Sequence, residues 1–333
     1  SRLKHLPAFD ACIIDEAHMV SDKENTGYQR ILRRLFETNP NMDLFGMTAT
    51  PWRLASGALV AGDTFTCVAH ELPIEALVEN ASLAPVVAYA PRQAQISTRG
   101  LKVASTGDYK TSDVQARVEG TSDDVARHVA QALQEGRRAA LVFCVSVQHV
   151  EDMTACLRGA GLRAAGLTQK SEDREEVLQA LQAGELDAVA NCEILTTGFD
   201  CPRVDIIALA RPTASSALAV QMIGRGMRPF PGKDNCLILD HANVIAKNGP
   251  VTDPVIPEPN ATPATVTKRP PVMKPCPDCD LMIPAGATSC ECGWQAPARR
   301  VVITERPNSD MNPMGRRRRD IRAIRSVQVR PHM

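Results

Sequence analysis

Two adjacent carboxylates follow an apolar run near the start of the sequence. Residues 12–19 read Cys-Ile-Ile-Asp-Glu-Ala-His-Met, and Asp15 and Glu16 come directly after residues 11–14, which we expect to form a strand buried on both faces. Open α/β sheets bind ligands at the carboxyl ends of such strands. There an Asp can hold Mg²⁺ through water and an adjacent Glu can polarise an attacking water, so the pair suits metal-assisted phosphoryl chemistry. Taken alone, residues 15–18 fit a solvated Asp-Glu pair at a strand end equally well.

Hydroxyl side chains end the next apolar run. Residues 44–47 predict a short strand, and Thr48, Ala49, Thr50 and Pro51 follow it. Hydroxyls beside the Asp-Glu strand could hydrogen-bond its carboxylates, and a simple turn is the alternative.

A glycine and an aspartate stand together in residues 194–202, Ile-Leu-Thr-Thr-Gly-Phe-Asp-Cys-Pro. Gly198 permits close approach of the backbone to a ligand, and Asp200 could accept a hydrogen bond from a ribose hydroxyl. An ordinary β-to-α turn is the alternative.

Two arginines lie three positions apart in residues 221–229, Gln-Met-Ile-Gly-Arg-Gly-Met-Arg-Pro. This spacing places Arg225 and Arg228 on one face of a helical turn, and a planar guanidinium suits phosphate charge that grows in a transition state. A solvated cap at a helix end is the alternative.

The elements that must position these residues alternate regularly. We expect helices at 28–37, from a Ser122 cap to Gly136, at 147–157, and from a Ser171 cap to Gly184. We expect strands at 86–90, 139–144, 163–167, 187–191, 205–210 and 235–240. Residues 66–91 read as an extended connection, and 92–120 show only a weak pattern. Such alternation predicts an α/β fold with a parallel sheet that is covered on both faces.

Four of the eleven cysteines are clustered near the carboxyl end. Two pairs about ten residues apart suit a tetrahedral structural zinc in a small ribbon; they are Cys276 with Cys279, and Cys290 with Cys292. The second pair is tighter than the usual spacing, and unliganded thiols are the alternative. The sequence shows no signal peptide and no apolar run of about 18 residues, which favours a cytoplasmic protein without membrane contact and, in turn, metal over disulfides.

The formal net charge is zero, but the charges are unevenly distributed. Residues 299–333 hold ten Arg against three acidic residues, which is +7 and leaves −7 for residues 1–298. A basic tail on an acidic body is typical of a nucleic-acid-binding extension. Salt-sensitive phosphate contacts would come from Arg316, Arg317, Arg318 and Arg319, and solvated disorder is the alternative.

In their order, these stretches resemble the motifs of the superfamily 2 helicases, which are ATP-driven nucleic-acid motors with two RecA-like lobes. Residues 15–18, Asp-Glu-Ala-His, are similar to motif II and residues 48–50 to motif III. Residues 141–146 are similar to motif IV, 196–200 to motif V and 221–228 to motif VI. Each match alone is weak, but five in the right order across about 220 residues are specific.

The resemblance implies ATP and Mg²⁺ as ligands, and it implies a role for each motif. Asp15 would coordinate Mg²⁺ and Glu16 would activate water, while Arg225 and Arg228 would act as arginine fingers. Residues that approach the nucleotide would be His18, Gly198, Asp200 and Gln221. Residues that couple the nucleotide to the other lobe would be His18, Thr48 and Thr50. Residues that lie along the nucleic-acid backbone would be Ser146, Thr196 and Thr197.

No Gly-x-x-x-x-Gly-Lys-Ser/Thr occurs in the sequence, so the phosphate-cradling loop of these helicases is missing. We therefore expect an amino-terminal truncation that leaves tandem RecA-like lobes with an incomplete first lobe, and we expect inefficient ATP hydrolysis. The expected parts are the end of lobe 1 (1–82), lobe 2 (83–248), a proline-rich linker (249–275), a zinc ribbon (276–296) and an arginine-rich tail (297–333).

A finer resemblance is to the bacterial RadD group and its phage relatives. It rests on residues 235–242 and 248–251, the proline-rich linker and the four-cysteine ribbon. It implies an ATPase of DNA repair or recombination that prefers DNA to RNA, with a single-strand-binding or recombination protein as a candidate partner. Two alternatives stay open, namely a non-hydrolysing module that binds nucleic acid or a partner, and the motor subunit of a restriction system.

Overall fold

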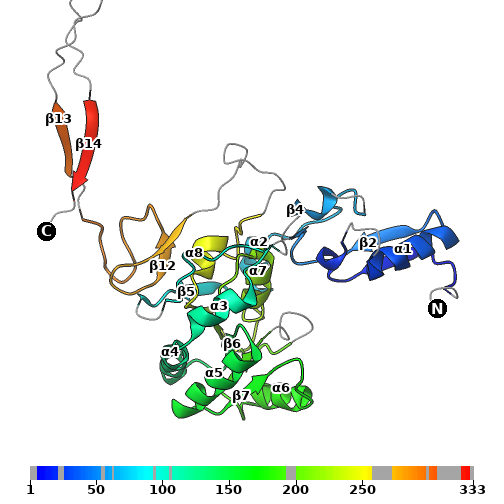
Figure 1. Ribbon diagram of the computed structural model, residues 1–333, viewed down its shortest axis with the longest axis horizontal. Coiled ribbons are helices and arrows are strands. Elements are labelled where there is room, and N and C mark those ends of the chain that lie inside the picture. Colours follow the sequence, from blue (N-terminus) through cyan, green and yellow to red (C-terminus); the bar gives the residue numbers. More distant parts are fainter. Residues whose placement is uncertain are drawn as a thin grey trace, which may run out of the picture. The chain divides into compact units, whose positions relative to one another are not determined.

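The computed structural model describes residues 6–21, 26–53, 57–61, 64–92, 95–104, 107–192, 200–256, 272–297, 300–305 and 324–330. The chain divides into two compact units, Ser1–Ala285 and Gly286–Met333, and each is described by itself (Figure 1).

The first strands form a small parallel pair at the start of the larger unit. Strand β1 (Ala11–Ile14) pairs with β2 (Asp43–Gly46), and α1 (Gly27–Thr38) connects them. Thr26 caps α1 by accepting a hydrogen bond from the Gln29 N–H at 3.4 Å. One face of the pair packs on α1 through Ile14, Val20 and Leu32.

The expectation that this first strand is buried on both faces is wrong. Ile13 is 65% exposed, and Phe45, its partner across the pair, is 51% exposed. In the described part of the chain β1 pairs with β2 alone, and α1 covers only the opposite face. An apolar run therefore indicated a strand but overstated its burial.

The connection that follows contains more regular structure than its sequence suggested. A short hairpin of β3 (Trp52–Arg53) and β4 (Gly57–Ala58) precedes a 3-10 turn (Leu59–Ala61) and helix α2 (Ile74–Glu79). Helix α3 (Thr111–Val118) lies where only a weak pattern was visible. Both helices are short, so few residues could reveal a helical period.

Six parallel strands form the central sheet of the larger unit, as predicted. Their order is β5-β10-β9-β6-β8-β7, and every neighbouring pair runs parallel. They are β5 (Val86–Tyr89), β6 (Ala140–Phe143), β7 (Ala164–Leu167), β8 (Ala188–Asn191), β9 (Ile206–Leu209) and β10 (Cys236–Asp240).

Helices cover both faces of this sheet (Figure 1). They are α4 (Ser122–Gln134), α5 (Val147–Gly159), α6 (Arg174–Ala183), α7 (Ser216–Gly224) and α8 (Val244–Asn248). Along β6, Ala140 and Val142 face α4 and α5, whereas Leu141 and Phe143 face the core shared with α3, α6, α7 and α8. All four residues are at most 2% exposed, which is the burial that a doubly covered parallel strand requires.

Two helix starts differ from their prediction. Helix α4 takes Thr121, not Ser122, as its N-cap residue, and α6 takes Asp173, not Ser171. The Ser171 hydroxyl instead accepts a hydrogen bond from the Thr168 N–H within the preceding loop. The predicted stop of α6 is confirmed, because Gly184 adopts a left-handed φ of 82°.

Short strand pairs complete both units. In the larger unit β11 (Met273–Pro275) pairs antiparallel with β12 (Met282–Pro284), and an isolated bridge joins Leu281 to Tyr89 at the end of β5. In the smaller unit β13 (Arg300–Glu305) pairs antiparallel with β14 (Ile324–Arg330).

Candidate functional site

Asp15 and Glu16 lie where β1 turns away from the sheet. The Met47 N–H donates to the Ile14 carbonyl at 2.8 Å, and the Ala17 N–H donates to the Met47 carbonyl at 2.9 Å. Between these ties Glu16 adopts a left-handed conformation with φ 51° and ψ 48°, which is uncommon for a residue with a side chain and costs about 1 kcal/mol or more. A short 3-10 turn, Ala17–Met19, then presents His18.

His18 joins three segments that lie far apart in the sequence. Its Nδ1 atom lies 2.9 Å from the Thr48 hydroxyl and 3.3 Å from the Glu16 carboxylate. Its Nε2 atom lies 3.1 Å from the amide nitrogen of Gln221, on α7. The structure thus brings together residues from three of the predicted motifs.

The partners of His18 allow a tautomer to be assigned. With the Gln221 amide nitrogen facing the ring as placed here, Nε2 accepts from Gln221, which assigns the ring proton to Nδ1, facing Thr48 and Glu16. Burial lowers the pKa of His18, and the nearby Glu16 carboxylate opposes this effect. A neutral imidazole at neutral pH is consistent with both observations.

The two threonines of residues 48–50 have different environments. The Thr48 hydroxyl accepts from the Thr50 N–H at 3.1 Å and donates to the Thr50 carbonyl at 3.2 Å, so it organises the turn as well as contacting His18. The Thr50 side chain is fully buried, and its own hydroxyl has no hydrogen-bond partner within the described residues.

The two arginines lie at the end of α7. Ser215 caps this helix by accepting from the Leu218 N–H at 2.9 Å, and the helix ends at Gly224, so Arg225 occupies the C-cap position. Arg225 is only 9% exposed. Burial and the neighbouring Arg228 lower the pKa of Arg225, whereas Glu16 and Asp200 oppose the shift. Arg225 therefore lies within electrostatic reach of both acidic residues.

Arg228 pairs with Asp200. The Arg228 Nη1 atom lies 3.1 Å from the Asp200 Oδ1 atom, and the two side chains are 30% and 72% exposed. The stretches 194–202 and 221–229, which were both predicted to approach a nucleotide, are thus in direct contact through these two side chains.

Ser146, a predicted site residue, makes other contacts. Ser146 caps α5 by accepting from the His149 N–H at 3.2 Å, and it also hydrogen-bonds Gln115 at 2.5 Å. Its predicted contact with nucleic acid stays a prediction. The residues predicted at Thr196, Thr197, Gly198, Arg316, Arg317, Arg318 and Arg319 lie outside the described part of the chain.

Trp52 and Lys233 support the site, and the sequence analysis did not identify them. The Trp52 Nε1–H donates to the Ser216 hydroxyl at 3.0 Å, which fastens the chain after Thr50 to the first turn of α7. Lys233 donates to three backbone carbonyls around Arg228. Neither residue belongs to a periodic pattern or a motif, so no sequence signal pointed to them.

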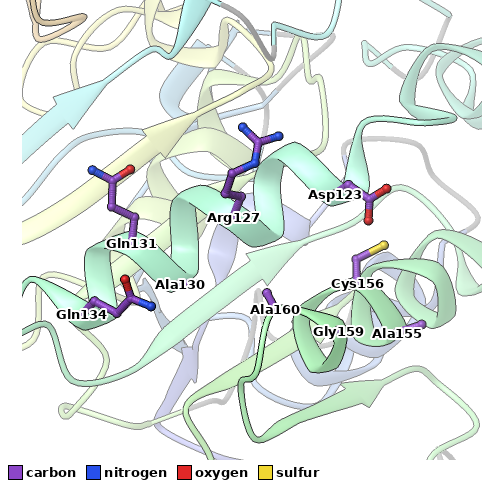
Figure 2. A pocket seen from close by; sticks show the side chains of 9 residues that line it. All are labelled: Asp123, Arg127, Ala130, Gln131, Gln134, Ala155, Cys156, Gly159 and Ala160. Carbon is purple, nitrogen blue, oxygen red and sulfur yellow. The ribbon is translucent and has the colours of Figure 1, made fainter.

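A groove of about 860 Å³ lies elsewhere, between α4 and α5 (Figure 2). Arg127 and Gln131 line it from α4, and Cys156 and Gly159 line it from α5. Burial raises the pKa of the Cys156 thiol to about 11, so this cysteine is a weak nucleophile at neutral pH. None of the predicted site residues lines this groove.

The four clustered cysteines come together. Their sulfur atoms all lie within 4.8 Å of one another, which includes the tightly spaced second pair. Around a tetrahedral zinc with Zn–S bonds of about 2.3 Å, the sulfurs stand about 3.8 Å apart, so the donor set and spacing suit zinc.

Among the described residues, no helix combines the length and the apolar character that crossing a bilayer requires.

Comparison with protein families gives a match over the central part of the chain. Residues 124–229 match the family described as the helicase conserved C-terminal domain. This range runs from α4 to the end of the Arg225–Arg228 segment, and thus contains most of the central sheet.

Comparison with curated proteins gives partial matches to longer relatives. A Schizosaccharomyces pombe protein named as the mitochondrial ATP-dependent helicase irc3 is 30% identical over 262 residues, which cover 76% of this chain and 42% of the relative. A 51.5 kDa protein of a Lactococcus phage is 26% identical over 227 residues, covering 67% and 48%. The UvrABC system protein B of Chlamydia trachomatis is 30% identical over 125 residues, covering 35% and 19%. The chain spans less than half the length of each of these relatives.

A solved structure shares the fold. A fragment described as an HsdR subunit of a type I restriction enzyme from Vibrio vulnificus superposes with a TM-score of 0.54 at 23% identity, over 70% of this chain and 43% of that one. The α/β architecture with its parallel sheet is that of RecA-like helicase domains. Together with the sequence relatives, it supports a superfamily 2 helicase.

Proposed function

We propose that this chain supplies the motif II to motif VI part of an ATP-dependent motor that moves on or remodels DNA. One observation carries the proposal. His18 contacts Glu16, Thr48 and Gln221, which come from three separate stretches that resemble three different helicase motifs. A solvated strand end or a simple turn gives no reason for these side chains to converge.

In this proposal each residue has a task at the nucleotide. Mg²⁺, when bound, would neutralise charge on the ATP phosphates. Asp15 would hold the metal through water, and Glu16 would polarise the attacking water from the carboxyl end of β1. Arg225 and Arg228 would place positive charge against the phosphates, because both lie at the end of α7 near Glu16 or Asp200.

The His18 contacts would couple the reaction to the rest of the motor. A change in charge at Glu16 reaches His18 Nδ1 over 3.3 Å, and His18 Nε2 reaches Gln221 on α7 over 3.1 Å. The same helix carries the segment that ends in Arg225 and Arg228. Nucleotide hydrolysis would therefore alter the contacts between the β1–β2 pair and the six-stranded sheet domain.

We also propose that efficient turnover needs a phosphate-binding loop in addition to the residues of this chain. The sequence contains no such loop, and the relatives are more than twice as long as the parts aligned to them. We keep the predicted division into lobe 1 (1–82), lobe 2 (83–248), linker, ribbon and tail as part of the proposal.

A structural zinc at the four cysteines and a RadD-like role in DNA repair complete the proposal. The sulfur cluster supports the zinc, and the resemblance across residues 235–242 and the ribbon supports the role. The zinc would stabilise the segment around the two cysteine turns and would take no part in hydrolysis.

The experiment uses this chain joined to a segment that supplies a phosphate-binding loop. We expect ATP turnover that DNA stimulates more strongly than RNA. The variant Glu16→Gln should lower kcat at least a hundredfold while nucleotide binding remains, because only the water-activating carboxylate is lost. The matched control is Glu175→Gln, which makes the same change on the exposed side of α6.

Different outcomes would reject different parts of the proposal. Turnover that Glu16→Gln leaves unchanged would remove Glu16 from the mechanism. DNA binding that is indifferent to nucleotide in every form of the protein would favour the binding-module alternative. Stimulation by RNA alone would overturn the choice of DNA.

A further inference from the structure

Lys233 lies in the turn between α7 and β10, and its ammonium group makes three hydrogen bonds to backbone carbonyls. The Nζ atom donates to the carbonyl oxygens of Pro202 at 3.2 Å, Val204 at 2.5 Å and Arg228 at 2.8 Å. An ammonium has three N–H donors, so each has one backbone acceptor. The side chain is half-buried, which makes these hydrogen bonds more valuable than exposed ones.

The three carbonyls belong to two segments that carry site residues. Pro202 and Val204 follow Asp200 by two and four positions, and the third carbonyl is that of Arg228 itself. The Asp200 and Arg228 side chains form an ion pair at 3.1 Å. Lys233 therefore joins the main chain on one side of this ion pair to the main chain on the other side.

The ion pair needs such support. Asp200 is 72% exposed and Arg228 is 30% exposed, and exposed pairs contribute only about 0 to 1 kcal/mol. A pair of that strength cannot fix two loops in place by itself. The ammonium of Lys233 makes three charge-assisted hydrogen bonds to backbone carbonyls and supplies a further constraint on the two segments.

The polar groups near Lys233 do not compete with the three carbonyls for its ammonium group. The thiols of Cys201 and Cys236 are buried, and burial raises the pKa of both, to about 12 for Cys236, so they stay neutral. Asp205 is occupied by the Arg138 and Ala139 N–H groups at 2.9 and 3.3 Å. Burial lowers the pKa of Lys233, and the nearby Asp205 opposes that shift.

We propose that Lys233 is a positioning residue for the Arg225–Arg228 segment. By hydrogen-bonding the carbonyls of Pro202, Val204 and Arg228, it holds the Arg228 guanidinium against Asp200. What Arg228 then does to a phosphate rests on the proposed function. The geometric claim does not, and it can be tested without nucleotide.

The experiment follows the Arg228 guanidinium in the whole chain by NMR with labelled arginine. Its Nε–H signal is assigned by its loss in Arg228→Gln, and Asp200→Asn gives the signal position of the guanidinium without this ion pair. We expect Lys233→Met to move the Arg228 signal to the position that it has in Asp200→Asn. We expect Lys233→Arg, which keeps a charged donor with several N–H groups, to leave it nearer the wild-type position.

The matched control is Lys247→Met. Lys247 belongs to the same unit, and its ammonium hydrogen-bonds Tyr109 and lies over that ring. Within the described residues its side chain hydrogen-bonds neither segment of the ion pair. This variant should leave the Arg228 signal in place. If Lys247→Met shifts the signal as far as Lys233→Met does, the effect is general loosening and the proposal fails.

A second measurement covers the case in which Lys233→Met does not fold. In the wild-type chain, an ammonium held by three acceptors exchanges its protons slowly enough to give a lysine Nζ signal at neutral pH. That signal should be absent from Lys233→Arg. Its absence from the wild-type chain, or an Arg228 signal that does not move in a folded Lys233→Met variant, overturns the proposal. Neither readout involves ATP, so a failure here is distinguishable from a failure of the proposed motor function.

Discussion

Gly226, between the two arginines, should not tolerate even a methyl group. A Cβ atom at this position would lie 2.2 Å from the Cys236 sulfur and 2.7 Å from the Ile207 Cγ1 atom. Both neighbours are fully buried in adjacent strands of the central sheet. Contacts this short force a backbone shift, and overpacking of this kind costs about 1 to 3 kcal/mol.

The neighbouring Gly224 provides the control. A Cβ atom there meets nothing within 4 Å, and the residue ends helix α7. Gly224→Ala should therefore be neutral or stabilise the protein by up to about 1 kcal/mol through helix propensity. We expect Gly226→Ala to lower the free energy of unfolding by about 2 kcal/mol, measured by urea denaturation with circular dichroism.

A double-mutant cycle identifies the cause. Cys236→Ala removes the sulfur that the new methyl group meets, so the double variant with Gly226→Ala should be more stable than the sum of the single effects by about 1 kcal/mol. Ile207 remains close, so the rescue is partial. A Gly226→Ala protein as stable as wild type, or single effects that add within about 0.5 kcal/mol, would refute the packing argument.

Three further predictions concern titration and metal. His149 accepts a hydrogen bond from the Val145 N–H and is 2% exposed, and burial lowers its pKa from 6.5 to about 4. The folded state therefore binds fewer protons than the unfolded state between these values, so stability is full above pH 6.5 and falls by about 3 kcal/mol as the pH drops to 4; denaturation at several pH values should show this loss, and His149→Gln should reduce it. Gln221→Glu places a carboxylate beside Nε2 of His18, which should raise the pKa of His18 in an NMR titration above its value in Gln221→Met; equal pKa values in the two variants would contradict the assigned contact. Metal analysis should find about one zinc per chain, with Cys276→Ser losing it and Cys67→Ser, an exposed cysteine outside the cluster, retaining it; zinc retained in both would reject the site.

The strands of the central sheet could be predicted because their burial leaves a continuous apolar run. Residues 139–144 and 205–210 contain β6 and β9 within one residue at each end. The predicted caps failed where two polar residues compete. Ser171 and Asp173 both suit an N-cap, and the local turn at Thr168, which no pattern specifies, uses the serine.

The candidate site was predictable as a set of residue types, and its contacts were not. Asp15, His18 and Arg228 were predicted from residue type, spacing and motif order, yet the pairing of His18 with Gln221 joins positions 203 apart. Lys233 illustrates the limit, since its role depends on where three backbone carbonyls point. Sequence reports side-chain chemistry and carries little information about carbonyl direction.

The parallel pairing of β5 with β10 has a consequence for synthesis of the chain. Val86 lies opposite Cys236, 150 positions later, and among the described strands β5 joins this sheet through β10 alone. Strand β10 must therefore be synthesised before β5 can join the sheet. Until then β5 has no partner strand in this sheet, while β6 to β9 are synthesised. Pairing over such a separation is slow, and an unpaired strand is open to wrong partners. The order of strands in this sheet thus makes its completion a late event in the life of the nascent chain.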